Sequence, residues 1–186
     1  MKHNDKADSL LRRDTPLQTR RTLAVLRDSD HISVLFVCLG NICRSPAADG
    51  IMRAVVGSHD AGARWTVDSA GTGGWHVGDL PDRRMRIHAR RRGYELDHVC
   101  RQVRVADFDN FDLIIGMDSA NVRDLKRLAP TLEAEAKVAA MIDFVDPAMG
   151  HDCVPDPYYD GAEGFENVLT LLENGCANLY DVLTPR

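Results

Sequence analysis

The sequence predicts an α/β fold, a single-domain doubly wound four-stranded parallel sheet with helices on both faces. Three observations lead to this prediction. Short apolar segments alternate along the chain with longer segments of helical spacing, as in parallel strands joined by crossover helices. The 186 residues and 44% hydrophobic content suit one domain with a buried core. A loop with glycine and asparagine also joins the first strand to the first helix, where such sheets bind ligands.

The predicted domain spans residues 32–186. Its first strand, at 32–37, is apolar and too short for a helix, which favours a strand buried on both faces. Ser45 is a candidate N-cap and Pro46 suits the first position of the following helix. That helix is expected at 47–56, and the other elements are strands at 65–67, 112–117 and 137–142 and helices at 82–92, 119–128 and 163–183.

Residues 1–31 precede this alternation. They mix basic residues with scattered aspartates, and their few apolar residues form no sustained stripe. Such a segment cannot bury much apolar surface. The sequence therefore predicts a mobile or partly helical N-terminal extension outside the domain.

Composition restricts the class of protein. A net charge of -5 argues against a general nucleic-acid or membrane-surface binder. The sequence has no run of eighteen apolar residues and no secretory leader pattern. Five cysteines are too few for a disulfide scaffold and fit a reducing, cytoplasmic compartment. Because CxxC and HExxH patterns are absent, neither a metal nor another cofactor is predicted.

The loop at residues 38–45, CLGNICRS, carries the candidate chemistry. A tight turn before a helix N-terminus can aim backbone N–H groups at an oxyanion of phosphate size. Gly40 and Asn41 suit it because they tolerate left-handed backbone conformations. The positive field would lower the pKa of Cys38 and make it nucleophilic, while the planar fork of Arg44 can grip two phosphate oxygens.

The stretch VLFVCLGNICRSPAADGIM resembles the signature of the low-molecular-weight protein tyrosine phosphatases. The resemblance continues through DSAGT, WHVGDLPD, FDLIIGMDSANVRDL and VPDPYYDG and covers roughly residues 32 to 183. It implies hydrolysis of phosphotyrosine and aryl phosphates through a phosphocysteine intermediate. It also implies tyrosine-phosphorylated proteins as partners, with bacterial-type tyrosine kinases among the candidates.

The resemblance also assigns roles to individual residues. Asp156, in the DPYY motif, would protonate the leaving phenolate and later activate water. Asp152 and Asp160 are nearby rivals for this role. Asn41, Ser45 and His98 would support the phosphate loop through side-chain hydrogen bonds. The substrate would contact the loop residues and an aromatic entrance, namely Leu39, Gly40, Asn41, Ile42, Cys43, Trp75, Tyr158 and Tyr159.

Three further expectations remain open. In many members of this family a second loop cysteine, here Cys43, forms a reversible disulfide with the nucleophile, which implies redox sensitivity. An arsenate reductase of the same fold and an inactive phosphotyrosine-binding module are the alternative functions. The arginines of the predicted helix at 82–92 are either a solvated face or a surface that steers phosphorylated substrates or an acidic partner.

Overall fold

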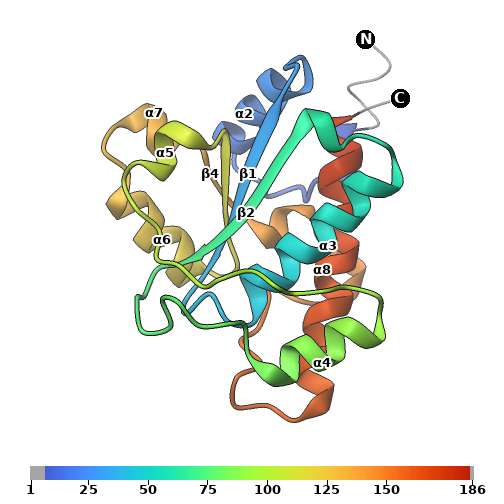
Figure 1. Ribbon diagram of the computed structural model, residues 1–186. Helices are drawn as coiled ribbons and strands as arrows, with labels where there is room; N and C mark the ends of the chain where they lie inside the picture. Colours follow the sequence, from blue (N-terminus) through green and yellow to red (C-terminus); the bar gives the residue numbers. More distant parts are fainter. Residues whose placement is uncertain (1–6, 185–186) are drawn as a thin grey trace.

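Four parallel strands in the order β2-β1-β3-β4 form the centre of the computed structural model, which describes residues 7–184 (Figure 1). They are β1 (Ile32–Cys38), β2 (Trp65–Gly71), β3 (Leu113–Gly116) and β4 (Val138–Ala140). Every residue of β1 is buried, as expected for a central strand covered on both faces. The predicted fold class is confirmed.

Helices cover both faces of the sheet (Figure 1). Alternate side chains of β1 belong to two hydrophobic clusters on opposite faces of the sheet. Val34 and Phe36 are part of the first cluster, and Leu35 and Val37 are part of the second. On the first face lie α2 (Leu17–Arg27), α3 (Arg44–Ser58) and α8 (Ala162–Leu183), and on the second lie α5 (Asp107–Asn110), α6 (Ser119–Leu128) and α7 (Leu132–Glu135). Because all four strands are parallel, their carboxyl ends lie at the same edge of the sheet, and α4 (Arg83–Arg91) lies near this edge.

β2 and β4 differ most in length from their predictions. β2 continues through DSAG to Gly71, beyond the predicted 65–67, because its polar side chains have partners within the fold, such as Ser69 with Asn41. β4 is short because the chain enters a 3₁₀ helix at Met141–Phe144. Further 3₁₀ turns lie at Gly62–Arg64 and Pro147–Met149.

The N-terminal segment is packed in its described part, residues 7–31, and includes the helix α2, whereas the sequence predicts an extension that is mobile or partly helical. Leu23 and Leu26 of α2 are buried and belong to the same cluster as α8. Arg12 also donates to the carbonyl oxygen of Val145. The apolar stripe is too short to stand out in the sequence. Residues 1–6 and 185–186, which belong to the predicted extension and domain, lie outside the described residues.

Candidate active site

A cavity of about 270 Å³ opens where β1 ends. It brings together Cys38, Arg44 and Asp156, which are widely separated in the sequence. The other lining residues are Leu39, Gly40, Ile42, Cys43, Trp75, His76, Tyr158 and Tyr159. All the residues predicted to contact substrate, except Asn41, therefore line one cavity.

The loop between β1 and α3 turns its carbonyl oxygens away from the cavity. Flanking segments donate to them: the Thr72 and Gly73 N–H groups to Cys38 and Leu39, the Asp82 N–H to Ile42, and the Ala47 N–H to Cys43. By contrast, none of the backbone N–H groups of residues 39 to 44 donates to a described residue. These donors, together with the α3 N-terminus, can bind an oxyanion.

Asn41 supports the loop from beneath and does not line the cavity. Its backbone is left-handed, with φ of 56°, and its side chain is fully buried. The amide nitrogen donates to the hydroxyls of Ser45 (2.9 Å) and Ser69 (3.0 Å), and the amide oxygen lies 3.0 Å from Nε2 of His98. These hydrogen bonds fit the loop-supporting role that the resemblance implies for the Asn41 side chain, while substrate contact through its backbone N–H group stays a prediction.

Ser45 lies inside α3, whose N-cap is Cys43, so the predicted N-cap role of Ser45 is wrong. The Ser45 hydroxyl instead contacts groups outside α3. Its Oγ lies 3.0 Å from Sγ of Cys38 and 3.1 Å from the carbonyl oxygen of Ala70, so its single proton can be directed to either acceptor. Cys38 itself is 2% exposed, so this hydroxyl is placed to stabilise negative charge on a buried sulfur.

Arg44 is almost fully buried, and carboxylates hold both ends of its guanidinium. Nη1 donates to Asp118 (2.6 Å) and to the carbonyl oxygen of Val154 (3.2 Å), and Nη2 donates to Asp156 (2.8 Å). Burial alone would lower the pKa of Arg44, but negative charge at Cys38, Asp156 and Asp118 raises it overall. Arg44 therefore keeps its positive charge beside the sulfur.

Asp156 is the aspartate of its loop that reaches the cavity. Its side chain is 43% exposed, and its second carboxylate oxygen accepts from the Tyr158 N–H group. Neither rival lines this cavity: Asp152 lines a separate one, and Asp160 packs against the first turn of α8 at Gly164. The geometry thus favours Asp156 for proton transfer at the cavity.

Aromatic side chains form the rim. Trp75 is 73% exposed and Tyr159 is 95% exposed, so neither serves as a core anchor. The rings of Tyr158 and Tyr159 meet edge to face with centroids 5.0 Å apart. Exposed aromatic surface at a cavity mouth is suited to contact with a planar ring.

Cys43 lines the same cavity but is buried. Burial raises its pKa far above the usual range, and the negative charges at Asp82 and Cys38 act in the same direction. Cys43 is therefore a neutral thiol at physiological pH. Cys100 is also buried: its thiol donates to the carbonyl oxygen of Asn41, and burial raises its pKa to about 11.

Sequence reasoning missed several residues of the site. Asp118 follows a buried strand and precedes a helix, as Cys38 does, so the same rule would have placed it at this edge. His76 lies beside Gly40, and no sequence pattern singles it out. Gly71 allows the loop to approach β2: a Cβ atom there would lie 2.8 Å from the carbonyl oxygen of Leu39.

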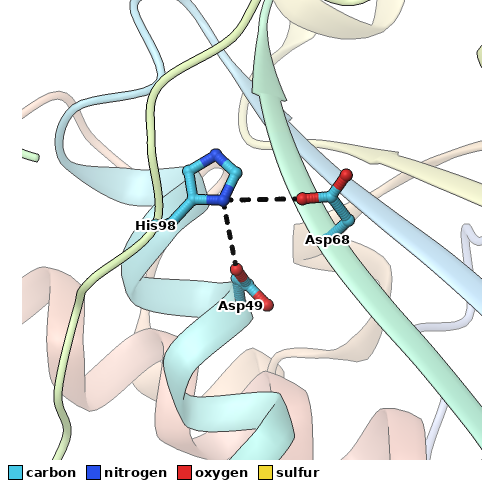
Figure 2. A group of neighbouring side chains, drawn as sticks. All are labelled: Asp49, Asp68 and His98. Atoms are coloured by element: carbon cyan, nitrogen blue, oxygen red, sulfur yellow. Dashed lines mark ion pairs between the residues drawn. The ribbon is translucent and has the colours of Figure 1, made fainter. Parts of the chain in front are cut away.

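Behind the loop, Asp49, Asp68 and His98 lie together (Figure 2). Nδ1 of His98 is 3.8 Å from Asp49 and 3.5 Å from Asp68, and their donor atoms lie within 4.8 Å of one another, as metal ligands could. However, Arg53 pairs with Asp49 and Arg101 with Asp68. The group thus already forms an ion-pair network that supports His98.

Ionisation of this network is not uniform. Burial raises the pKa of Asp49 to about 6, although Arg53 opposes the shift. Burial lowers the pKa of His98, while the nearby Asp68 carboxylate acts in the opposite direction.

Between residues 7 and 184 no helix has the length and apolar character needed to cross a membrane.

Known proteins resemble this chain in sequence and structure. The family model "Low molecular weight phosphotyrosine protein phosphatase" matches residues 33–185. A low molecular weight protein-tyrosine-phosphatase of Streptomyces coelicolor is 45% identical over 148 residues, which cover 78% of this chain and 90% of that protein. The human low molecular weight phosphotyrosine protein phosphatase is 40% identical over 136 residues, 73% of this chain and 85% of that protein.

A solved structure extends this similarity to three dimensions. The crystal structure of a protein tyrosine phosphatase from Entamoeba histolytica superposes with a TM-score of 0.77 at 43% sequence identity. The match covers 80% of this chain and 94% of that chain.

Proposed function

The chain belongs to the low molecular weight phosphotyrosine protein phosphatase family and is a protein tyrosine phosphatase, and we propose that Cys38, Arg44 and Asp156 carry out its reaction. The supporting observation is their convergence on one cavity beneath a ring of free backbone N–H groups. Cys38 is the nucleophile, Arg44 binds the phosphate and Asp156 transfers the proton.

In the first step, the Cys38 thiolate attacks phosphorus. An S–P bond forms, and the bond from phosphorus to the phenolic oxygen breaks. Because phenolate is a poor leaving group, its conjugate acid having a pKa near 10, Asp156 donates a proton to the departing oxygen. Loop N–H groups and Arg44 stabilise charge on the transferring phosphoryl oxygens.

In the second step, water attacks the phosphocysteine. The Asp156 carboxylate accepts a proton from this water, the S–P bond breaks, and inorganic phosphate leaves while the Cys38 thiolate is restored. Ser45, with its Oγ 3.0 Å from the sulfur, stabilises the thiolate both before it attacks phosphorus and when it is released from the phosphocysteine. Arg44 exchanges its contact with Asp156 for phosphate when substrate binds, while Asp118 holds the other arm.

The proposed partner is a tyrosine-phosphorylated protein in the cytoplasm, and a bacterial-type tyrosine kinase is a specific candidate. A phosphotyrosine side chain is long enough to place its phosphate in the cradle while its ring contacts the aromatic rim. Phosphoserine is shorter, so its backbone would meet the rim first. Capture of phosphoproteins by Cys38→Ser from a lysate of the source organism would identify the partner.

Substitution of the nucleophile tests the mechanism. Cys38→Ser should abolish hydrolysis of para-nitrophenyl phosphate and of phosphotyrosine peptides, because a serine hydroxyl is not ionised in this site. Circular dichroism and binding of inorganic phosphate should remain near the wild type. Cys153→Ser, in the separate cavity, is the matched control and should retain activity. Residual turnover above about 1% in Cys38→Ser would contradict the assignment, and an inactive wild type would favour the binding-module alternative.

We also propose that Cys43 protects Cys38 during oxidation. Peroxide oxidises the Cys38 thiolate to a sulfenic acid, and the Cys43 thiol then condenses with it to form a disulfide and release water. Inactivation by peroxide should therefore be reversed by dithiothreitol in the wild type and in Cys153→Ser. Recovery of Cys43→Ser to the same extent would contradict this role.

A further inference from the structure

Helix α4 carries a row of arginines on its outward face. Arg83, Arg86 and Arg90 are spaced at i, i+3 and i+7, which places them on one side of the helix. Arg91 lies beside Arg90. Arg83, Arg90 and Arg91 are exposed, and Arg86 is half-buried. We call these four residues the α4 basic face.

The α4 basic face has little neutralising charge. Arg90 pairs with Glu95 at 2.8 Å, whereas Arg83, Arg86 and Arg91 have no carboxylate partner within 4.0 Å among residues 7–184. Among the described residues, a carboxylate therefore pairs with one of these four guanidinium groups and not with the other three. The other two arginines of this segment are paired: Arg84 with Asp82, and Arg92 with both Glu166 and Glu173.

The first turn of α4 belongs to the wall of the active site. The Asp82 N–H group donates to the carbonyl oxygen of Ile42 in the phosphate loop at 2.8 Å. The guanidinium of Arg84 lies 5.3 Å from the ring centroid of Tyr158, which lines the cavity. Arg83 lies between these two residues in the sequence. The N-terminal end of the basic face is therefore next in sequence to residues that contact the phosphate loop and the cavity lining.

The length of the face can be compared with that of a peptide. A helix rises about 1.5 Å per residue, so Arg83 and Arg90 are about 10 Å apart along the axis. An extended chain covers about 3.3 Å per residue, so three residues span this distance. A substrate segment leaving the cavity along α4 would meet the arginines within a few residues of its phosphotyrosine.

We propose that the α4 basic face binds acidic side chains located about two to five residues from the phosphotyrosine of a protein substrate. This specificity rests on the proposed phosphatase function of Cys38. The charge of the whole chain is -5, so a local positive surface beside the cavity is what distinguishes acidic from neutral substrates. Small aryl phosphates do not reach α4 and are unaffected by it.

Charge reversal tests the proposal. The variant is Arg83→Glu/Arg86→Glu, and Arg83→Gln/Arg86→Gln removes the charges without reversing them. The matched control, Arg13→Glu/Arg21→Glu, makes the same change in net charge at two exposed arginines of the N-terminal segment that do not line the cavity. Substrates are three phosphotyrosine peptides with acidic, neutral or lysine residues at these positions, and para-nitrophenyl phosphate.

For the acidic peptide, kcat/KM should fall about 5- to 10-fold in the Glu variant, mainly through KM, and less in the Gln variant. The lysine peptide should gain in the Glu variant. Rates with para-nitrophenyl phosphate should stay within about 2-fold, and the wild-type preference for the acidic peptide should shrink at about 0.5 M salt.

Equal losses for all three peptides, or equal losses in the N-terminal control, would overturn the proposal. So would an unchanged ratio of acidic to neutral peptide. The proposed function is tested separately by para-nitrophenyl phosphate: if the wild type does not hydrolyse it, that function fails. If hydrolysis is normal but the peptide ratio does not change, the docking surface alone fails.

Discussion

Asp118 holds Arg44 from outside the cavity, with a distance of 2.6 Å between its Oδ2 and Nη1 of the arginine. The same carboxylate caps α6, because its Oδ1 accepts from the Asn121 N–H group. Asp118 therefore couples the orientation of the phosphate-binding arginine to the start of a helix on the opposite face of the sheet.

Asp118→Asn should separate these two tasks. Asparagine is as good an N-cap as aspartate, so the melting temperature should change little. Loss of the negative charge should leave Arg44 less firmly oriented and lower kcat/KM for para-nitrophenyl phosphate about 10-fold, equivalent to about 1.4 kcal/mol. The inhibition constant of inorganic phosphate should rise as well. Asp118→Ala should additionally cost about 1 kcal/mol of stability; equal kinetics for wild type and Asp118→Asn would argue against the positioning role.

Asp156→Ala should show a dependence on the leaving group. Hydrolysis of phosphotyrosine should fall about 10²-fold or more, equivalent to roughly 2.7 kcal/mol, because tyrosine leaves poorly as an anion. Nitrophenolate needs less protonation, so formation of the phosphoenzyme from para-nitrophenyl phosphate should suffer less. Burst kinetics on both substrates measure that step. Equal losses would refute acid catalysis by Asp156.

Asp49→Asn should change how stability depends on pH. Burial raises the pKa of Asp49 from 3.8 to about 6, so the fold favours the protonated form. This contribution is fully present below pH 3.8 and is lost as the pH rises through about 6. At one pKa unit per 1.4 kcal/mol, the loss is on the order of 3 kcal/mol.

The melting temperature of Asp49→Asn minus that of the wild type should therefore increase between about pH 4 and pH 7. The exposed Asp30→Asn serves as control and should show no such trend. Loss of the Arg53 pair shifts the Asp49→Asn curve at neutral pH, so the slope of the difference, and not its absolute value, is the measurement. A flat difference would contradict the raised pKa.

Removal of residues 1–30 should lower stability with little effect on the chemistry. Leu23 and Leu26 of α2 are buried, and burial of each contributes about 1.5 to 3 kcal/mol. We expect a melting temperature several degrees lower, because a few kcal/mol are a large share of total stability. Turnover of para-nitrophenyl phosphate per folded molecule should stay within a few-fold, since every cavity residue follows residue 37. An unchanged melting temperature would show that α2 contributes nothing.

The parts predicted best from sequence are those in which local patterns and long-range contacts agree. The strand at 32–37 is a continuous apolar segment, the loop after it is marked by glycine and asparagine, and the long helix near the C-terminus has a strong apolar period. The structure contains all three. The misassigned parts depend on distant partners. Ser45 looks like an N-cap because its partners, Cys38 and Ala70, come from other segments.

Asp118 shows a second limit. The position after a buried strand is visible in the sequence, but which carboxylate meets Arg44 depends on the order of β1 and β3 in the sheet. The α2 helix shows a third limit, because two buried leucines are enough to pack it but too few to form a recognisable stripe.

The outward hydrogen bonds of the phosphate loop have a thermodynamic consequence. Donors at residues 47, 72, 73, 82 and 100 hold its carbonyl oxygens, so the shape of the cradle is set during folding and not by the ligand. The conformational entropy lost on ordering the loop is therefore already included in the stability of the protein. Sulfate, vanadate and phosphate should bind with no folding-like heat-capacity change, and compact, rigid oxyanions are the natural starting points for inhibitors of this cavity.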